Sequence, residues 1–469
     1  MSAHLTRATS SAGNQKTFTF SAWLRLGKII TTAHIFGSDV DDDGANYCHL
    51  SIEADGLLKF LSLNSSSIIA NLQTQAKYYD TTAWYHIVLR ADTTQSTAAD
   101  RIRMYVNGNQ VTAFATSTYP SQNDDLGLFK SGNATLVGAR ITTGTSNFWR
   151  GEMAHVHLAD GQSYAPSTFG ETDSTSGIWK PKTNPSVTYG TNGAFLKFEN
   201  SGAMGTDSSG NGNNFTVSGN VLQSVSTPSN KFPALNLRTT HYDYEGPNYQ
   251  PNGAHTFWGT TGTTRTCLID MCFGAGKWYA EYKIEEADAA NYIGVVLTDS
   301  RTPQKTMKHE GDLAQMATSS GSSAAISFKA SGTSLVYQGN TSSSYGTGIV
   351  DNDIIMIAFD CATGKMWAGR NGTWFNAPGT SNAGDPAAGT NDSGKTITNT
   401  DRELYTFYVG GTASGGSNRY SHINFGHGYF GTTAVASANS DANGLGVFEY
   451  AVPSGFYAVC SKNIQDYGG

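Results

Sequence analysis

The chain has 469 residues, a formal net charge of −7 and 14% charged residues, against roughly 25% in an ordinary globular chain. The chain is instead rich in Ser, Thr and Asn and has 53 Gly. Its 8 Trp, 23 Tyr and 22 Phe supply the apolar area that a disordered chain lacks. An acidic chain without a run of Lys and Arg is not expected to bind nucleic acid. No apolar stretch reaches the ~18 residues of a transmembrane helix, and the N-terminus lacks an apolar signal core. We therefore expect neither membrane insertion nor a secretory signal.

The first 200 residues predict short strands separated by polar loops. In residues 17–26 an apolar side chain recurs at every second position, which is typical of a half-buried strand. The residues on the apolar face are Phe18, Phe20, Ala22, Leu24 and Leu26. Residues 101–106 form another strand, and Asn107-Gly108 directly after it predicts a β-hairpin, because both residues tolerate positive φ. Further strands are expected at residues 84–90, 136–139 and 153–158.

Residues 160–240 are richer in proline and turn residues, and we interpret residues 201–240 as a strap between two domains. The aromatic residues of this region indicate an anchored segment rather than a flexible linker: Trp179, Phe195, Phe198 and Phe215.

Strands return in the last part of the chain, and a loop rich in Gly, Asn, Thr and Ser is expected at residues 380–400. Asn371-Gly372 predicts a second hairpin. The strands are expected at residues 277–284, 292–297, 354–360 and 404–409. The whole pattern predicts an all-β protein of two consecutive antiparallel β-sandwich (jelly-roll) domains, at residues 1–200 and 241–469.

The first domain resembles the laminin-G-like, concanavalin-A-like sandwich. The resemblance rests on W-Y-H-I-V at residues 84–88, Y-V-N-G at 105–108 and G-x-M-A-H-V-H at 151–157. The second domain is similar to a SPRY (B30.2-like) sandwich in G-K-W-Y-A-E at 276–281, G-K-M-W-A-G-R-N-G-T-W at 364–374 and I-N-F-G-H at 423–427. These resemblances imply fold and do not fix a ligand.

Three further stretches resemble large structural proteins of tailed bacteriophages. They are D-G-Q-S-Y-A-P-S-T-F-G-E-T-D at 160–173, Y-G-T-N-G-A-F-L-K-F at 189–198 and V-P-S-G-F-Y-A-V-C-S-K-N at 452–463. This resemblance implies a protein on the virion surface, on capsid or tail, that is released by host lysis and contacts other phage virion proteins. Exposed sheet edges invite homo-oligomers, of which we favour a trimer.

Catalysis is not expected. The glucanases of the concanavalin-A-like class need an E-x-D-x-x-E strand that brings two carboxylates together, and no such strand occurs. A G-x-S-x-G nucleophile elbow is also missing. His155 and His157, two residues apart, could share one strand face, but no third metal ligand with a clear spacing accompanies them. The five cysteines form no C-x-x-C pair, so we expect buried free thiols.

Calcium binding is a hypothesis for two acidic loops, because Ca²⁺ takes six to eight oxygen ligands from carboxylates, amides and carbonyls. The candidate ligands are Asp39, Asp41 and Asp43 in the first loop, and Asp207, Asn211 and Asn213 in the second. The alternative is that both loops are ordinary polar turns closed by Asp and Asn side chains.

Glycan binding needs an aromatic face that stacks on a sugar, with polar groups to orient its hydroxyls. The candidates in loops are Tyr119, Trp149, Tyr242, Tyr244, Trp258 and Trp374. Each could instead be a core residue or face a neighbouring subunit. The sequence thus predicts a non-enzymatic virion protein that binds host-surface polysaccharide, with a decoration protein that binds only phage proteins, or a glycan hydrolase, as alternatives.

Overall fold

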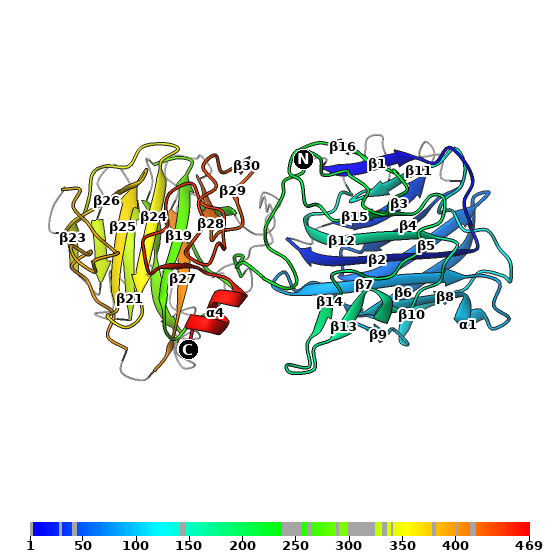
Figure 1. The fold of residues 1–469 in the computed structure, drawn as a ribbon, viewed down its shortest axis with the longest axis horizontal. Coiled ribbons are helices and arrows are strands. Elements are labelled where there is room, and N and C mark those ends of the chain that lie inside the picture. The colour runs from blue at the N-terminus through cyan, green and yellow to red at the C-terminus, as the bar shows by residue number, and fades with distance from the viewer. Residues whose placement is uncertain are drawn as a thin grey trace. The chain divides into compact units, whose positions relative to one another are not determined.

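The computed structural model describes residues 3–27, 31–39, 45–140, 147–236, 256–259, 265–287, 290–298, 324–330, 335–338, 341–377, 381–399, 402–412 and 419–469. Backbone contacts divide the chain into two compact units, Met1–Gln223 and Ser224–Gly469. The division falls inside the stretch that we interpreted as a strap. Both units consist mainly of strands, which confirms the all-β sandwich class (Figure 1).

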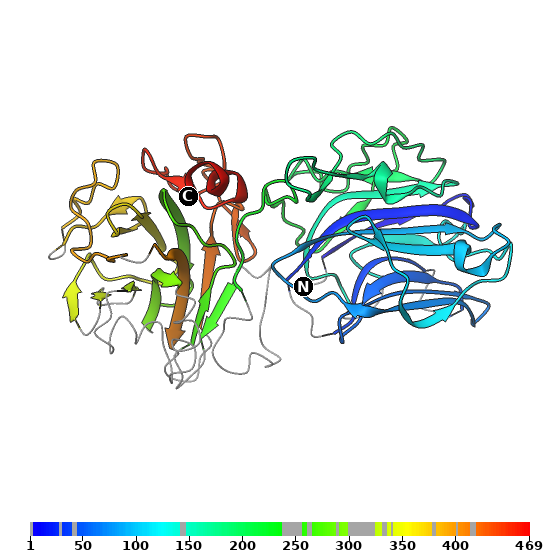
Figure 2. The same ribbon diagram turned by 90° about the horizontal axis from the view of Figure 1, so that it is seen from below.

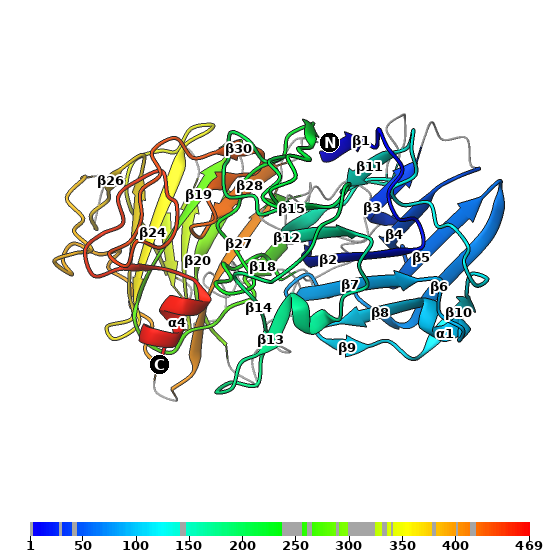
Figure 3. The ribbon, with the colours of Figure 1, turned by 45° about the vertical axis from the view of Figure 1, so that its right-hand side comes forward.

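The first unit contains two large sheets in its described part. The first has the order β10 (Phe114–Thr118), β6 (Ser67–Lys77), β5 (Leu57–Asn64), β4 (Cys48–Ile52), β3 (Ala33–Asp39), β11 (Ala134–Val137), β1 (His4–Ala8) and β16 (Thr216–Ser218). The second has the order β15 (Ala194–Leu196), β12 (Gly151–Asp160), β2 (Thr17–Leu26), β7 (Trp84–Asp92), β8 (Ile102–Val106) and β9 (Asn109–Gln110). Figure 3 shows β15, β12, β2 and β7 side by side. Shorter elements are α1 (Ala98–Arg101), the 3₁₀ turn Pro166–Thr168, β13 (Gly170–Thr172) and β14 (Trp179–Pro181).

Strand β2 has the predicted bounds, and the five alternating residues from Phe18 to Leu26 all lie in the core between the sheets. The residues between them are buried as well, although they face the other way. The segment after β12 covers that outer face: Thr19 Oγ donates to the carbonyl of Gln162, and Tyr164 N donates to Thr19 Oγ. In Figure 2 this green segment lies over the strands that it covers. Period-two alternation predicted the strand, but not that both of its faces would be buried.

Both predicted hairpins are confirmed. Val106 pairs with Asn109 across Asn107 and Gly108, whose φ angles are 49° and 81°. Arg370 pairs with Thr373 across Asn371 and Gly372, at 48° and 85°. Two successive positive φ angles are the mark of the I′ turn, whose twist matches that of the flanking strands.

The second unit also contains two large sheets in its described part. One has the order β17 (Thr256–Gly259), β28 (Arg419–Asn424), β19 (Lys277–Ile284), β24 (Ile354–Asp360), β25 (Lys365–Arg370) and β26 (Thr373–Trp374), with β31 (Tyr457–Ala458) parallel to β19. The other has the order β18 (Arg265–Leu268), β27 (Leu404–Thr412), β20 (Ala290–Thr298), β21 (Ala325–Ala330), β22 (Leu335–Gln338) and β23 (Thr341–Ser344). A small pair, β29 (Tyr429–Phe430) and β30 (Thr433–Ala434), precedes the C-terminal helix α4 (Ser461–Tyr467), drawn in red in Figure 1.

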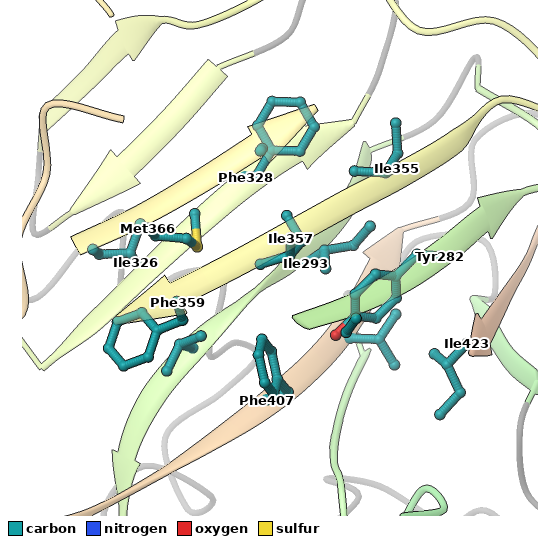
Figure 4. Packing of buried hydrophobic residues seen from close by; sticks show 14 of the residues in the cluster. Tyr282, Ile293, Ile326, Phe328, Ile355, Ile357, Phe359, Met366, Phe407 and Ile423 are labelled. Carbon is teal, nitrogen blue, oxygen red and sulfur yellow. The ribbon is translucent and has the colours of Figure 1, made fainter. Parts of the chain in front are cut away.

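The core of the second unit fills the space between its two sheets. Figure 4 shows Tyr282, Ile357 and Phe359 from one sheet meeting Ile293 and Phe407 from the other. Strands β19 and β24, whose bounds match the prediction, contribute alternate side chains to it. Four of the five cysteines are buried as expected, but Cys272 is exposed, so the expectation of buried thiols was wrong for that residue.

The aromatic anchors expected between residues 160 and 240 are in place. Phe195 and Phe215 are buried in the core of the first unit, and Phe198 packs against it. Trp179 lies against His86 on the outer face of the sheet, with ring centroids 6.0 Å apart. The stretch from Trp179 to Phe215 is therefore anchored on the first unit.

Candidate functional site

A serine and a histidine meet on the outer face of β2 and β7, in an arrangement that resembles a nucleophile and its base. Ser21 Oγ lies 2.9 Å from Nε2 of His86, and both residues are fully buried. The other ring nitrogen, Nδ1, lies 3.0 Å from Nε1 of Trp179. An indole nitrogen can only donate, so Nδ1 of His86 accepts and Nε2 carries the proton.

His86 therefore donates to Ser21 and cannot take its proton. Burial lowers the pKa of His86 to about 3, so the ring stays neutral near pH 7. A nucleophilic serine needs the opposite arrangement, with the unprotonated nitrogen facing its hydroxyl. The cluster is a structural hydrogen-bond network beneath the covering segment.

The histidine pair on β12 follows the prediction in part. A bulge between Ala154 and His157 shifts the register with β2, and His155 has a positive φ of 48°. The two rings still lie 6.2 Å apart, and His157 stacks on Phe195 at 3.9 Å. Its Nδ1 lies 2.8 Å from the hydroxyl of Tyr189. Within the described residues, no group of three His, Cys, Asp or Glu side chains is placed to hold a metal.

The first calcium candidate is described only at its edge. Asp39 ends β3 and is buried. Asp41 and Asp43 lie outside the described residues. Calcium binding by this loop stays a prediction.

The second calcium candidate is closed by its own hydrogen bonds. One carboxylate oxygen of Asp207 accepts from the amides of Phe195 and Ser209, and the other from Ser209 Oγ and the amide of Asn213. Asn213 turns its NH₂ group toward the carbonyls of Thr191 and Gly193, at 2.9 and 2.8 Å. Asn211 donates in the same way to the carbonyls of Gly190 and Gly193. These contacts correspond to the polar-turn alternative, since amide donors are not calcium ligands.

Of the two glycan candidates in the first unit, Trp149 is buried and Tyr119 is partly exposed. Trp149 is 8% exposed and packs in the core, so its ring offers no face to a sugar. Tyr119 is half-buried against the same core. Tyr242 and Tyr244 lie outside the described residues, as does the side chain of Trp258, whose backbone belongs to β17.

Trp374 in the second unit lies at a partly exposed aromatic surface. It packs against a small cluster on the outer face of β19, β24 and β25, with its ring centroid 6.2 Å from that of buried Tyr279. Tyr450 packs against the same cluster from the segment that precedes β31. We call Trp374 and Tyr450 the aromatic pair.

Gly372 connects the two members of the aromatic pair, because it forms the hairpin turn just before Trp374 and also contacts Tyr450. A Cβ at Gly372 would lie 3.0 Å from Cδ1 of Tyr450. The absence of a side chain there lets the Tyr450 ring lie on the turn. Sequence reasoning found Trp374 but missed Tyr450, because nothing local to residues 445–452 places them beside the hairpin.

The first unit is similar in sequence to a known family of sandwich proteins. A family model described as "Concanavalin A-like lectin/glucanases superfamily" (Laminin_G_3) matches residues 2–162, about a third of the chain. The first unit thus has the concanavalin-A-like lectin fold that its sequence predicted. No curated protein matches the chain.

The chain is also similar to several solved structures, with which it shares little sequence. The native heptameric SAP-like pentraxin of Limulus polyphemus is 15% identical, with 41% of this chain and 88% of that chain covered and a TM-score of 0.28. The SPRY domain of human HERC1 is 11% identical over 36% and 87%, with a TM-score of 0.25. Domains LG4-5 of the mouse laminin alpha1 chain are 10% identical over 86% and 80%, with a TM-score of 0.27. In the part of the chain that the structure describes, no helix has the length and apolar character needed to cross a membrane.

Proposed function

We propose that this protein is a non-enzymatic surface protein of a tailed-phage virion that binds host-surface glycans through the aromatic pair Trp374 and Tyr450. The observation that carries the proposal is this partly exposed pair, seated on a buried cluster beside a tight hairpin. Such a site suits a pyranose, because an aromatic face packs on the apolar CH face of the sugar.

Polar groups beside the pair are available to orient sugar hydroxyls. Thr373 is exposed at the hairpin, and the carboxylate of Glu449 is held by Ala436 N at 2.7 Å and Ser437 Oγ at 3.2 Å. Thr373 directly precedes Trp374 in the sequence, and Glu449 directly precedes Tyr450. The Glu449 carboxylate suits a neutral or weakly basic glycan better than a sulfated or phosphorylated one.

The virion setting is supported by sequence alone, through the three stretches that resemble phage structural proteins. In that setting the chain would contact other virion proteins and form a homo-oligomer, for which we favour a trimer. The lectin-like fold of the first unit agrees with adhesion but names no ligand.

The test is binding of the purified chain to envelope polysaccharides from candidate hosts, measured by titration for wild type, Trp374→Ala and Tyr450→Ala. Tyr79→Ala is the matched control, because it removes a tyrosine that is 44% exposed in the first unit. The proposal is supported if wild type binds saturably and each variant of the aromatic pair weakens the affinity at least tenfold. Tyr79→Ala should bind like wild type, and none of the variants should change the thermal transitions.

Two results count against it. Release of reducing sugar from the bound polysaccharide would point to a hydrolase. Absence of glycan binding, together with saturable binding to phage particles that lack this protein, would identify a decoration protein.

A further inference from the structure

A fully buried glutamate lies beneath the aromatic pair. Glu281 is on the outer face of β19, with 0% of its surface exposed, and its carboxylate accepts four hydrogen bonds. One oxygen accepts from the hydroxyl of Tyr279 at 2.9 Å and from the amide of Tyr450 at 2.8 Å. The other accepts from Nδ2 of Asn424 at 3.2 Å and from the amide of Glu449 at 2.9 Å.

These donors come from two layers of the second unit. Tyr279 and Asn424 belong to the sheet, on β19 and its neighbour β28. Glu449 and Tyr450 belong to the segment that covers the sheet, and both bonds from that segment are made by the backbone. The carboxylate therefore ties the backbone that carries the Tyr450 ring directly to the sheet.

We propose that Glu281 is the positioning residue of the glycan site: its carboxylate fixes the backbone of Tyr450 and so holds the Tyr450 ring on the Gly372 turn that precedes Trp374. This inference rests on the proposed function for its consequence, but the positioning itself can be measured without a ligand.

The four partners select a carboxylate. The two backbone amides can only donate, and Asn424 is fixed as a donor because its Oδ1 accepts from the amides of Gly426 and Gly428. A carboxylate offers acceptors on both oxygens, whereas a glutamine offers one oxygen and one NH₂ group. In a Glu281→Gln chain, one of the amides of Glu449 and Tyr450 must therefore face another donor.

Protonation of Glu281 would have the same effect as glutamine, because a carboxylic acid brings its own O–H donor into the cluster. Burial raises the pKa of Glu281 to about 7, while its four donors act in the opposite direction. Charged and ionisable side chains in this neighbourhood are Tyr279, Lys283, Asp353, Arg370, Glu449 and Tyr450.

The experiment compares wild type, Glu281→Gln and Asp441→Asn in the full chain. Asp441 is the matched control, because it is a second buried carboxylate of the same covering segment. It accepts from the amides of Asn443, Leu445 and Ala458, and not from that of Tyr450. Fluorotyrosine at position 450 reports the environment and mobility of the ring, and amide hydrogen exchange reports the backbone of residues 445–452.

We expect Glu281→Gln to shift and narrow the fluorotyrosine signal and to speed exchange of the Glu449 and Tyr450 amides at least tenfold. Asp441→Asn should speed exchange at Asn443 and Leu445 and leave the fluorine signal of Tyr450 in place. The wild-type signal should move toward that of Glu281→Gln between pH 8 and pH 6, and the variant should show no such change.

An unchanged fluorine signal in Glu281→Gln would overturn the inference, and so would equal effects of the two variants on Tyr450. Glycan titration separates this result from the proposed function. If no glycan binds wild type while the Tyr450 signal still depends on Glu281, then the proposed function fails and the positioning role stands.

Discussion

The ring of Tyr450 lies on the turn residue Gly372, where a Cβ would come within 3.0 Å of Cδ1 and 3.2 Å of Cε1. Contacts this close require the ring to move when a side chain is added. Gly372 also has a φ of 85°, in the left-handed region that L-residues occupy at a cost. The turn and the proposed glycan site are thus linked through one glycine.

Gly372→Ala should lower the unfolding free energy of the second unit by about 1–2 kcal/mol, through backbone strain, and weaken glycan binding by displacing Tyr450. Gly108→Ala is a close control: φ is 81°, a Cβ would lie 3.0 Å from the ring of Trp179, and the residue belongs to the first unit. Chemical denaturation and glycan titration of both variants check this. If both variants bind the glycan equally well, then a side chain at Gly372 does not disturb binding through Tyr450, and the prediction is wrong.

Trp179→Phe should destabilise the first unit by about 1 kcal/mol, because it removes the indole donor to Nδ1 of His86 and keeps most of the ring packing. Urea denaturation of the variant against wild type measures the difference.

The geometry of the Ser21–His86–Trp179 network also predicts that Ser21 does not react with a fluorophosphonate, since His86 donates to it. Labelling that disappears in Ser21→Ala would contradict the assigned tautomer.

Acid should destabilise the first unit more than the second. Burial lowers the pKa of His34 to about 4 and of His86 to about 3, and holds those of His49 and His157 well below 6.5. The unfolded chain takes up these protons near pH 6.5 and the folded unit does not. Stability is therefore lost as pH falls from 6.5 toward 4, by at most about 1.4 kcal/mol per pH unit for each histidine.

The second unit contains two groups whose titration changes its stability in opposite directions as pH falls. His422, with its pKa lowered to about 4 by burial, destabilises the unit in acid like the histidines above. Glu281, with its pKa raised from 4.5 to about 7, contributes stability that is present at low pH and lost as pH rises from 4.5 to 7. Calorimetry at pH 7, 6 and 5 should show the first-unit transition falling faster, with Gly108→Ala and Gly372→Ala assigning the two transitions. Parallel shifts of both transitions would contradict these assignments.

Asp207→Asn should destabilise the first unit by about 2 kcal/mol, because an amide cannot accept all four hydrogen bonds that the carboxylate receives. We expect calcium and a chelator to leave the first-unit melting temperature unchanged, since Asn211 and Asn213 present donors to the loop. A rise with calcium that Asp207→Asn abolishes would show that the loop rearranges around the ion. A rise that persists in the variant would point to the Asp39 loop.

The sequence by itself determined the elements whose signals are local. Alternation predicted β2 and β19 with their observed bounds, because one buried face imposes a period of two, and a continuous apolar run predicted β24. The two Asn-Gly steps predicted as turns, at residues 107–108 and 371–372, formed hairpins, since I′ turns need positive φ at adjacent residues and Asn and Gly adopt it at little cost. Fold class followed from these elements together.

The tertiary structure alone decided which side chains meet. Alternation could not show that the outer face of β2 is covered, and so could not show that Trp179 fixes the tautomer of His86. Nor could it distinguish Trp149, which is buried, from Trp374, which is partly exposed. The contacts of Glu281 with Asn424 and Tyr450 join segments far apart in sequence. Local propensity carries no information about such pairs, because they form only when the covering segment closes on the sheet.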